Sequence, residues 1–290
     1  MKHQKRSLFC LFCLFLFLTA LCTVSADIGP KDQLTVYLTN PPQETYYLDL
    51  LWQPDTAGSF SNLSEEELAE LDPALLSRLE NEAPEGWAPA MVCGTPLPMR
   101  GDLVGHPQGD QRVHVFGYVG LPQVCRILLV TESGRQILTD PIERKVLQSS
   151  VTLDCASGRL YQSSPAVALG ISFLATLLPT LLIEGLLLLL FGFSLRRNWK
   201  AFVLANLVTQ IALTLIVHTT LLVSGTVSAH LVRFPTELAI LVAETIFYRR
   251  FLTGQSRGRR TGYGICANLV SWIVGFFSLG TLFELMRSLC

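Results

Sequence analysis

The sequence predicts an α+β membrane protein: an extracytoplasmic, antiparallel β-sandwich-like domain with a short helical insertion, followed by a four-helix transmembrane bundle. Of the 290 residues, 50% are hydrophobic and only 16% are charged. The formal net charge of −1 hides a division, because residues 27–164 carry 19 acidic and 9 basic side chains whereas residues 165–290 carry 4 and 10. The long apolar stretches of the mature chain all lie in the second part. This composition excludes a disordered chain, a collagen-like repeat and a basic nucleic-acid-binding protein.

The first 26 residues have the pattern of a signal peptide. Three basic side chains within the first six positions precede an apolar stretch over residues 8–21 and small residues up to Ala26. We expect cleavage after Ala26, which would leave the next domain outside the membrane. An uncleaved anchor helix is the alternative, but about 14 apolar residues are fewer than the roughly 20 that cross a bilayer. A lipoprotein cysteine at Cys22 is a further alternative, although bulky Leu21 stands where that signal has a small residue.

Residues 27–164 are predicted to form a domain of short strands. Stretches rich in β-branched, aromatic and leucine residues are separated by turn signals such as Asn40-Pro41-Pro42 and Asp140-Pro141. Several short strands joined by such turns indicate an antiparallel sandwich. The expected strands are 34–39, 45–52, 112–119, 125–131, 135–139, 142–147 and 151–154.

A helical insertion is expected at about residues 64–82. Ser64 followed by Glu67 forms a capping box, and the leucines after it keep a helical spacing, with Pro73 dividing the segment or opening a second helix. The acidic run Glu65-Glu66-Glu67 suits the positive end of a helix dipole. A calcium or partner site is the alternative, but no EF-hand spacing is present.

The cysteine and histidine residues of this domain do not predict a metal site. Cys93, Cys125 and Cys155 contain no CxxC pair, and both a Cys125–Cys155 disulfide and buried free thiols remain open. His106 and His114 lie near a glycine-rich loop, which we interpret as a connector rather than a binding loop, because two histidines without a third ligand do not make a zinc site. The identity of any metal stays unknown, and no cofactor is expected. No catalytic residues are assigned, since motifs such as GxSxG or HExxH are absent from the sequence.

Four transmembrane helices are expected at about residues 165–193, 201–224, 231–248 and 262–286. Basic residues gather in the first and third connections, which the positive-inside rule places in the cytoplasm. Around the connection between the second and third helices, the only basic or histidine side chains are His230 and Arg233, as expected of an outside position. The N-terminal domain and the C-terminus are therefore both expected to be extracytoplasmic, in a multi-pass protein of the cell membrane.

Polar side chains within the apolar stretches are the main sign of chemistry in this half. An ionisable group at mid-membrane costs roughly 2.5 to 3.5 kcal/mol and therefore usually faces the bundle interior. Counted from the cytoplasmic arginines, Glu184 and Glu237 should lie at similar depth. The predicted inner polar or ion site comprises Glu184, Glu237, Glu244, Asn206, Gln210 and Asn268. The predicted outer polar cluster comprises His218, Arg233, Glu284 and Arg287.

Two interpretations of these polar residues remain open. Paired carboxylates could carry protons or bind a cation, with the amides as neutral ligands. Alternatively, the same groups hydrogen-bond between helices and only hold the bundle together. Ala267, Ser271 and Gly275, spaced four apart, are interpreted as a small-residue seam for close packing. A glutamate-type intramembrane protease has little support, since no second glutamate stands beside Glu244.

The order of these parts loosely resembles a group of uncharacterised bacterial integral membrane proteins with a signal peptide, an exported β-rich domain and four C-terminal helices. The resemblance implies an architecture and no activity. The residues that carry it are Asn40-Pro41-Pro42, Tyr46-Tyr47-Leu48-Asp49-Leu50-Leu51, Leu178-Pro179-Thr180 with Glu184, Phe191-Gly192-Phe193, Asn206-Leu207-Val208-Thr209, and Glu237 with Glu244.

For function, the sequence favours a non-enzymatic integral membrane protein that presents an exported binding or sensory module. The alternative is a cation- or proton-linked membrane transport component that uses the intramembrane glutamates. The expected partners are the lipid bilayer and an exported or membrane protein, and no nucleic acid.

Overall fold

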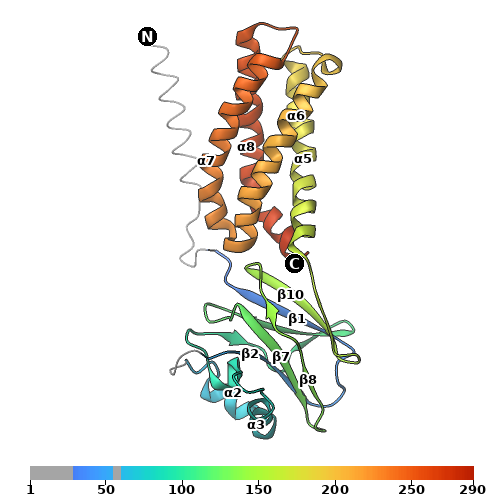
Figure 1. The fold of residues 1–290 in the computed structure, drawn as a ribbon, viewed down its shortest axis with the longest axis vertical. Coiled ribbons are helices and arrows are strands. Elements are labelled where there is room, and N and C mark those ends of the chain that lie inside the picture. Colours follow the sequence, from blue (N-terminus) through green and yellow to red (C-terminus); the bar gives the residue numbers. More distant parts are fainter. Residues whose placement is uncertain (1–28, 55–59) are drawn as a thin grey trace.

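The computed structural model describes residues 29–54 and 60–290. The predicted signal peptide therefore lies outside the described residues. Within them, a β-rich domain packs against one end of an elongated helical domain, and the C-terminus lies at the junction of the two (Figure 1). The α+β class predicted from the sequence is confirmed.

The first sheet of the β-rich domain joins strands from both ends of that domain. It contains β1 (Gln33–Thr39), β4 (Arg100–Gly101), β5 (His106–Gln108), β6 (Gln111–Gly117), β10 (Gln148–Asp154) and β11 (Arg159–Gln162), in the order β11-β10-β1-β6-β4 with β5 also paired to β6. β1 directs Leu34, Val36 and Leu38 into the core, since alternate side chains of a strand point to opposite faces. β1 pairs antiparallel with β6 but parallel with β10. The predicted antiparallel order is therefore wrong at this pair, because the second sheet lies between the two strands in sequence and forms a long crossover.

The second sheet is antiparallel and packs on the first. It contains β2 (Tyr46–Trp52), β3 (Ala88–Pro89), β7 (Val124–Thr131), β8 (Gln136–Leu138) and β9 (Ile142–Glu143), in the order β3-β2-β7-β8 with β9 also paired to β7. β2 is buried on both faces, because core side chains cover one face and short helices cover the other. β9 is shorter than the predicted strand 142–147, since the residues after it leave this sheet towards the helical domain.

Short helices of the insertion cover the second sheet. They are α2 (Glu65–Glu70), α3 (Pro73–Asn81) and, after β3, α4 (Ala90–Cys93). Ser64 caps α2 in the predicted capping box, with its hydroxyl accepting from the Glu67 N–H at 3.2 Å. Pro73 opens α3 at its first position, where a missing N–H costs nothing. The acidic run in α2 thus has a structural role at a helix N-terminus.

A buried carboxylate holds α4 on β2. Asp49 is 0% exposed and accepts hydrogen bonds from the N–H groups of Met91 and Val92, at 3.0 and 3.2 Å. Its other oxygen accepts from the Leu50 N–H at 2.7 Å. Burial raises the pKa of Asp49 to about 7, and these hydrogen bonds oppose the rise. Both oxygens have partners, so Asp49 has a structural role.

Three helical stretches among the described residues are long and apolar enough to cross a membrane. The first is α5 (Pro165–Leu190), and the third is α8 (Arg257–Arg287). The second stretch, Leu195–Phe251, contains α6 (Leu195–Leu213), a π-helical segment η1 (Thr214–His218) and α7 (Thr219–Phe251).

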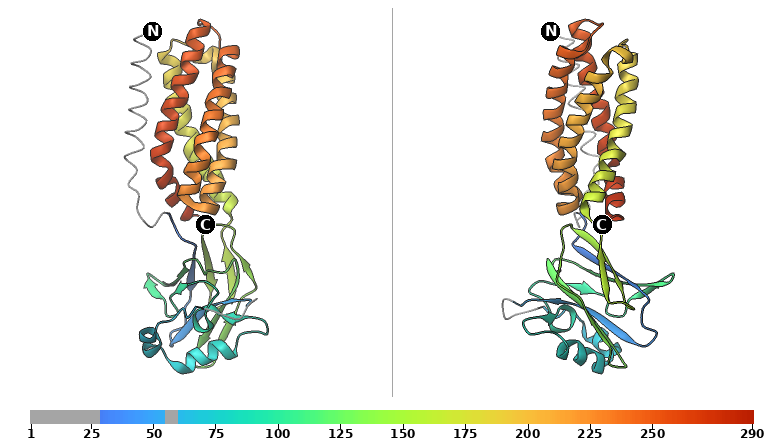
Figure 2. Two further views of the ribbon diagram at one scale, coloured as in Figure 1. Left: turned by 90° about the vertical axis from the view of Figure 1, so that its left-hand side faces the viewer. Right: turned by 45° about the vertical axis from the view of Figure 1, so that its right-hand side comes forward.

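The second stretch folds back on itself at Gly225. The backbone there has φ 77° and ψ −175°, a conformation that favours glycine and breaks the helix. Asn206 in α6 donates to the hydroxyl of Tyr248 in α7 at 3.0 Å, so the two arms lie side by side (Figure 2). The predicted loop between residues 224 and 231 is therefore shorter in the structure, where only a turn around Gly225 separates the two helical arms.

Main-chain hydrogen bonds attach the β-rich domain to the helical domain. The N–H of Leu147 donates to the carbonyl of Leu222 at 2.8 Å, and the N–H of Ser150 donates to the carbonyl of Cys290 at 2.7 Å. Gly225 lies beneath this contact, since a Cβ atom there would stand 3.1 Å from side-chain atoms of both Leu147 and Pro30. The turn in the helices and the junction of the two domains are therefore one feature.

Candidate functional site

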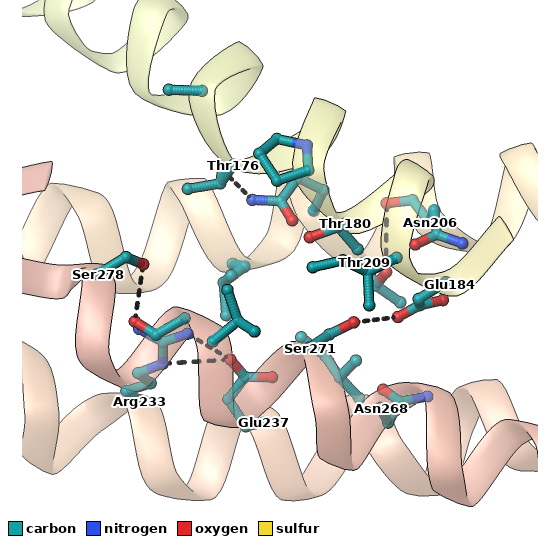
Figure 3. Close-up of a pocket in the computed structure, with 18 of the residues that line it drawn as sticks. Thr176, Thr180, Glu184, Asn206, Thr209, Arg233, Glu237, Asn268, Ser271 and Ser278 are labelled. Carbon is teal, nitrogen blue, oxygen red and sulfur yellow. Dashed lines mark hydrogen bonds and ion pairs between the residues drawn. The ribbon is translucent and has the colours of Figure 1, made fainter. Parts of the chain in front are cut away.

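A polar cavity of about 160 Å³ lies between the helices (Figure 3). Its walls come from α5, α6, η1, α7 and α8. The predicted inner site residues all line it, together with two members of the predicted outer cluster: Glu184, Glu237, Glu244, Asn206, Gln210, Asn268, His218 and Arg233. The helical periodicity that places apolar side chains outside therefore brings these polar side chains together inside.

Glu184 of α5 has one satisfied and one unsatisfied oxygen. The Ser271 hydroxyl of α8 donates to Glu184 Oε1 at 2.9 Å, as Figure 3 shows. Glu184 Oε2 is buried and has no hydrogen-bond partner in the described part of the chain. The side chain is only 2% exposed, so bulk water does not replace the missing partner.

Glu244 of α7 forms hydrogen bonds with side chains of two neighbouring helices. Thr209 Oγ1 lies 2.6 Å from Glu244 Oε1, and Asn268 Nδ2 lies 3.0 Å from Glu244 Oε2. Thr209 Oγ1 is also 3.0 Å from the carbonyl oxygen of Ala205. A hydroxyl carries one proton, so both bonds of Thr209 can form together only if Glu244 supplies a proton of its own.

Glu237 of α7 is held in a closed ion pair. Arg233 Nη2 lies 2.9 Å from Glu237 Oε1, and Arg233 Nη1 donates to the carbonyl of Gly275 at 2.6 Å. A Cβ atom at Gly275 would overlap the guanidinium group, so a larger residue there would displace the Arg233 side chain. Glu184 contacts Ser271 of α8, and Arg233, four residues before Glu237, contacts Gly275 of the same helix. The equal depth of Glu184 and Glu237 stays a prediction.

The neutral polar groups of the cavity mostly bond between helices. Gln210 donates to Thr176 at 2.5 Å, and His218 Nδ1 lies 3.1 Å from the Ser172 hydroxyl. Asn206 bonds Tyr248, as described above. These contacts agree with the packing interpretation for the amides and for His218. Thr176, Thr209 and Tyr248 were not among the site residues predicted from the sequence, since hydroxyls on apolar helices are common and carry no signal of their own.

The charges in the cavity do not balance if every carboxylate is ionised. Arg233 neutralises Glu237, but no ion pair joins Glu184 or Glu244 to a basic side chain within residues 29–54 and 60–290. A buried carboxylate without a counter-charge costs several kcal/mol, so it takes up a proton or a positively charged ligand. No group of three or more His, Cys, Asp or Glu side chains suited to a metal ion is found in the same residues.

Glu284 and Arg287, the remaining members of the predicted outer cluster, lie elsewhere. They form an exposed ion pair of 2.7 Å near the end of α8. Both line a cleft of about 530 Å³ between α8 and the first sheet, which Tyr37 and His106 also line. The outer cluster is therefore divided between two places.

The polar residues of the β-rich domain are separate from the cavity. His114 Nδ1 lies 2.7 Å from the carbonyl oxygen of Asp102, and Nε2 lies 3.2 Å from the Tyr46 hydroxyl. Burial lowers the pKa of His114 to about 4, so its ring is neutral at physiological pH. Cys125 and Cys155 are buried free thiols, the second of the two alternatives for these residues.

Comparison of the chain with protein-family models, with curated proteins and with solved structures found no match. The resemblance to bacterial membrane proteins thus gains no support from these comparisons. The geometry of the cavity and of the domain junction is what identifies candidate functions for this chain.

Proposed function

We propose that this chain is a non-enzymatic, multi-pass membrane protein that presents its β-rich domain outside the membrane as a binding or sensory module. The observation that carries this proposal is the direct main-chain attachment of the β-rich domain to the helical domain at Leu222 and Cys290. A change in the β-rich domain would pass to the helices through these bonds, without a flexible linker between the two parts.

The charge distribution supports the orientation. The helix ends remote from the β-rich domain, which are the start of α6, the end of α7 and the start of α8, are basic (Figure 1). They contain Arg196, Arg197, Lys200, Arg249, Arg250, Arg257, Arg259 and Arg260. The positive-inside rule places such an end in the cytoplasm and the β-rich domain outside. The fold-back at Gly225 lets the second apolar stretch cross twice, because a straight helix of 57 residues would be far longer than a bilayer is thick. The proposed bundle thus has four membrane-crossing helices.

Cysteine labelling in intact cells tests the orientation. Glu132→Cys in the β-rich domain and Arg257→Cys at the remote end are each made in a chain whose exposed Cys93 and Cys266 are replaced by serine. A membrane-impermeant maleimide should label position 132 and should label position 257 only after the cells are opened. The reverse pattern, or labelling of both in intact cells, would refute the proposed topology.

The module hypothesis also predicts that the β-rich domain folds alone. Its hydrophobic core is built from its own residues, with Phe116, Ile127 and Leu153 among the fully buried members. Residues 29–162, produced without the helices, should unfold cooperatively on addition of urea. A domain without a cooperative transition would mean that the helices are needed to complete it, and the idea of a separate module would then be lost.

A cation- or proton-linked transport component is the second candidate, and Glu184 is the observation that favours it. A satisfied packing residue would not leave Oε2 without a partner. In proteoliposomes, Glu184→Gln should abolish any pH-dependent ion flux of the wild-type protein, whereas Glu284→Gln should leave it unchanged. Equal fluxes in wild type and Glu184→Gln would remove Glu184 from such a mechanism.

A further inference from the structure

The cavity opens sideways between α5 and α8. Four of the described residues that line it are exposed: Ala175 and Pro179 on α5, and Val274 and Ser278 on α8. The other lining residues, including Glu184, are buried or half-buried. Pro179 has no N–H and so leaves the Ala175 carbonyl without its helical partner, which weakens α5 at this opening. An incoming molecule would therefore pass between these two helices.

The outer side of this opening is apolar. Leu174 and Leu178 on α5 and Phe277 on α8 are exposed beside it. Ala175 lies ten residues after the start of α5, about 15 Å along the helix. In the proposed membrane placement, the opening consequently faces lipid chains rather than water. A ligand that uses it must be soluble in lipid, which an inorganic cation is not.

The inner side of the opening is acidic. Glu184 Oε2 is buried without a hydrogen-bond partner among the described residues, and a second carboxylate, Glu244, also lines the cavity. The other titratable groups around Glu184 are Glu237, Tyr248 and Tyr263, and the Tyr263 hydroxyl lies 3.3 Å from the Glu184 carbonyl oxygen. Arg233 is already occupied by Glu237 and Gly275. A ligand with a basic group would therefore supply the counter-charge that Glu184 lacks among the described residues.

We propose that the cavity binds the amine group of a lipophilic amine, with the nitrogen at Glu184 Oε2 and the apolar tail passing out between α5 and α8. The amine enters neutral from the lipid. The Glu184 O–H bond then breaks and an N–H bond forms, so the proton moves to the nitrogen and an ammonium–carboxylate pair results without any other reactant. A cavity of about 160 Å³ has room for roughly five water molecules of about 30 Å³ each, enough for an ammonium group and its first methylenes. This inference rests on the proposed membrane placement, but it does not need the β-rich domain to be a sensor.

Octylamine is the probe, with octanol and methylammonium as matched comparisons. The full chain is placed in phosphatidylcholine nanodiscs, and the shift of its thermal midpoint is measured as each probe is added. Octylamine should raise the midpoint at least tenfold more potently than either comparison. Glu184→Gln should weaken the octylamine response at least tenfold, and Glu284→Gln, outside the cavity, should not. Ala175→Phe, which fills the opening and keeps Glu184, should weaken it as well.

Several outcomes would overturn the proposal. Octanol as potent as octylamine would mean that the site recognises only the tail, and methylammonium as potent would mean that the route is aqueous. An unchanged response in Glu184→Gln, or in Ala175→Phe, would remove the proposed partner or the proposed opening. Nanodiscs that contain phosphatidylethanolamine distinguish the source: competition with octylamine assigns the amine to a lipid headgroup, and no competition assigns it to a free amine. The cysteine labelling above is independent of these results, so a failure of the topology and a failure of the amine site can be told apart.

Discussion

The two domains each bury a carboxylate, but the two carboxylates differ in how many hydrogen bonds they accept. Asp49 of the β-rich domain is 0% exposed and Glu184 of the helical domain is 2% exposed. Both oxygens of Asp49 receive main-chain N–H donors, whereas one oxygen of Glu184 receives a single hydroxyl and the other receives nothing in the described residues. Burial alone therefore does not distinguish these two carboxylates, whereas the number of their hydrogen-bond partners does.

Two glutamates of the cavity show the same contrast. Glu237 and Glu184 line the same cavity, yet Glu237 has Arg233 as a counter-charge and Glu184 has no basic partner among the ion pairs described. The ion pair therefore accounts for the charges of Arg233 and Glu237, whereas Glu184 keeps one oxygen without a hydrogen-bond partner in the described residues.

The largest effect is expected when the satisfied carboxylate is removed. Asp49→Ala leaves the N–H groups of Leu50, Met91 and Val92 buried without an acceptor. Each such group costs about 1 to 3 kcal/mol, so we expect a loss of about 4 kcal/mol in the free energy of unfolding. Urea denaturation of residues 29–162 at pH 8 measures this loss, with exposed Glu132→Ala as the control. A loss below about 1 kcal/mol would show that Asp49 is not a structural residue.

The next effect concerns the ion pair in the cavity. Glu237→Gln removes the counter-charge of Arg233, which is 7% exposed, and should destabilise the helical domain by about 3 kcal/mol. Unfolding of the full chain in mixed micelles measures the change. Glu284→Gln is the matched control, because its ion pair with Arg287 is exposed and contributes less than about 1 kcal/mol. If the two variants were equally stable, the Arg233–Glu237 pair would not support the fold.

A pH effect is expected from His114. Burial lowers its pKa from 6.5 to about 4, so between these values the unfolded chain binds a proton that the folded chain does not bind. The contribution of His114 to the stability of the β-rich domain should therefore fall by about 2 kcal/mol as pH falls from 7 to 5, and this contribution should be absent in His114→Gln. The difference between wild type and variant isolates His114 from Asp49, whose raised pKa acts in the opposite direction. Parallel stability curves for the two proteins would contradict the assignment.

The smallest effect is expected at Glu184. Glu184→Gln keeps an oxygen for the Ser271 hydroxyl and removes a charge that has no basic partner, so stability should change by less than about 1 kcal/mol or increase. The same micelle experiment compares it directly with Glu237→Gln. A loss of the size expected for Glu237→Gln would place Glu184 among the structural residues and end the contrast between them.

Membership of the cavity could be predicted from the sequence, because polar residues on apolar helices face the interior whatever the details of packing. Which of these polar side chains pair with one another could not be predicted. Counting residues from the cytoplasmic arginines treats the helices as straight and parallel, but Pro179 interrupts α5 and α6 to α7 is one stretch broken at Gly225. The partner of Glu184 was hidden for a different reason. Ser271 belongs to a small-residue seam, and size alone does not reveal that its hydroxyl donates to a carboxylate.

In the β-rich domain, strand positions could be predicted better than strand partners. Alternation of apolar residues in β1 identifies the face of the strand that is buried, but it contains no information on the direction of the neighbouring strand. The parallel pairing with β10 therefore had no local signal. The role of Asp49 was equally hidden, because two of its three donors come from α4, which is far away in sequence.

The pairing of β1 with β10 also has a consequence in time. Val36 is opposite Val151, so the first strand must wait for its neighbour until more than a hundred further residues have been synthesised. β10 ends at Asp154, and α5 begins shortly afterwards at Pro165. The β-rich domain can close its first sheet only when the first apolar helix is about to emerge. Completion of the first sheet and synthesis of the first apolar helix are thus nearly simultaneous steps.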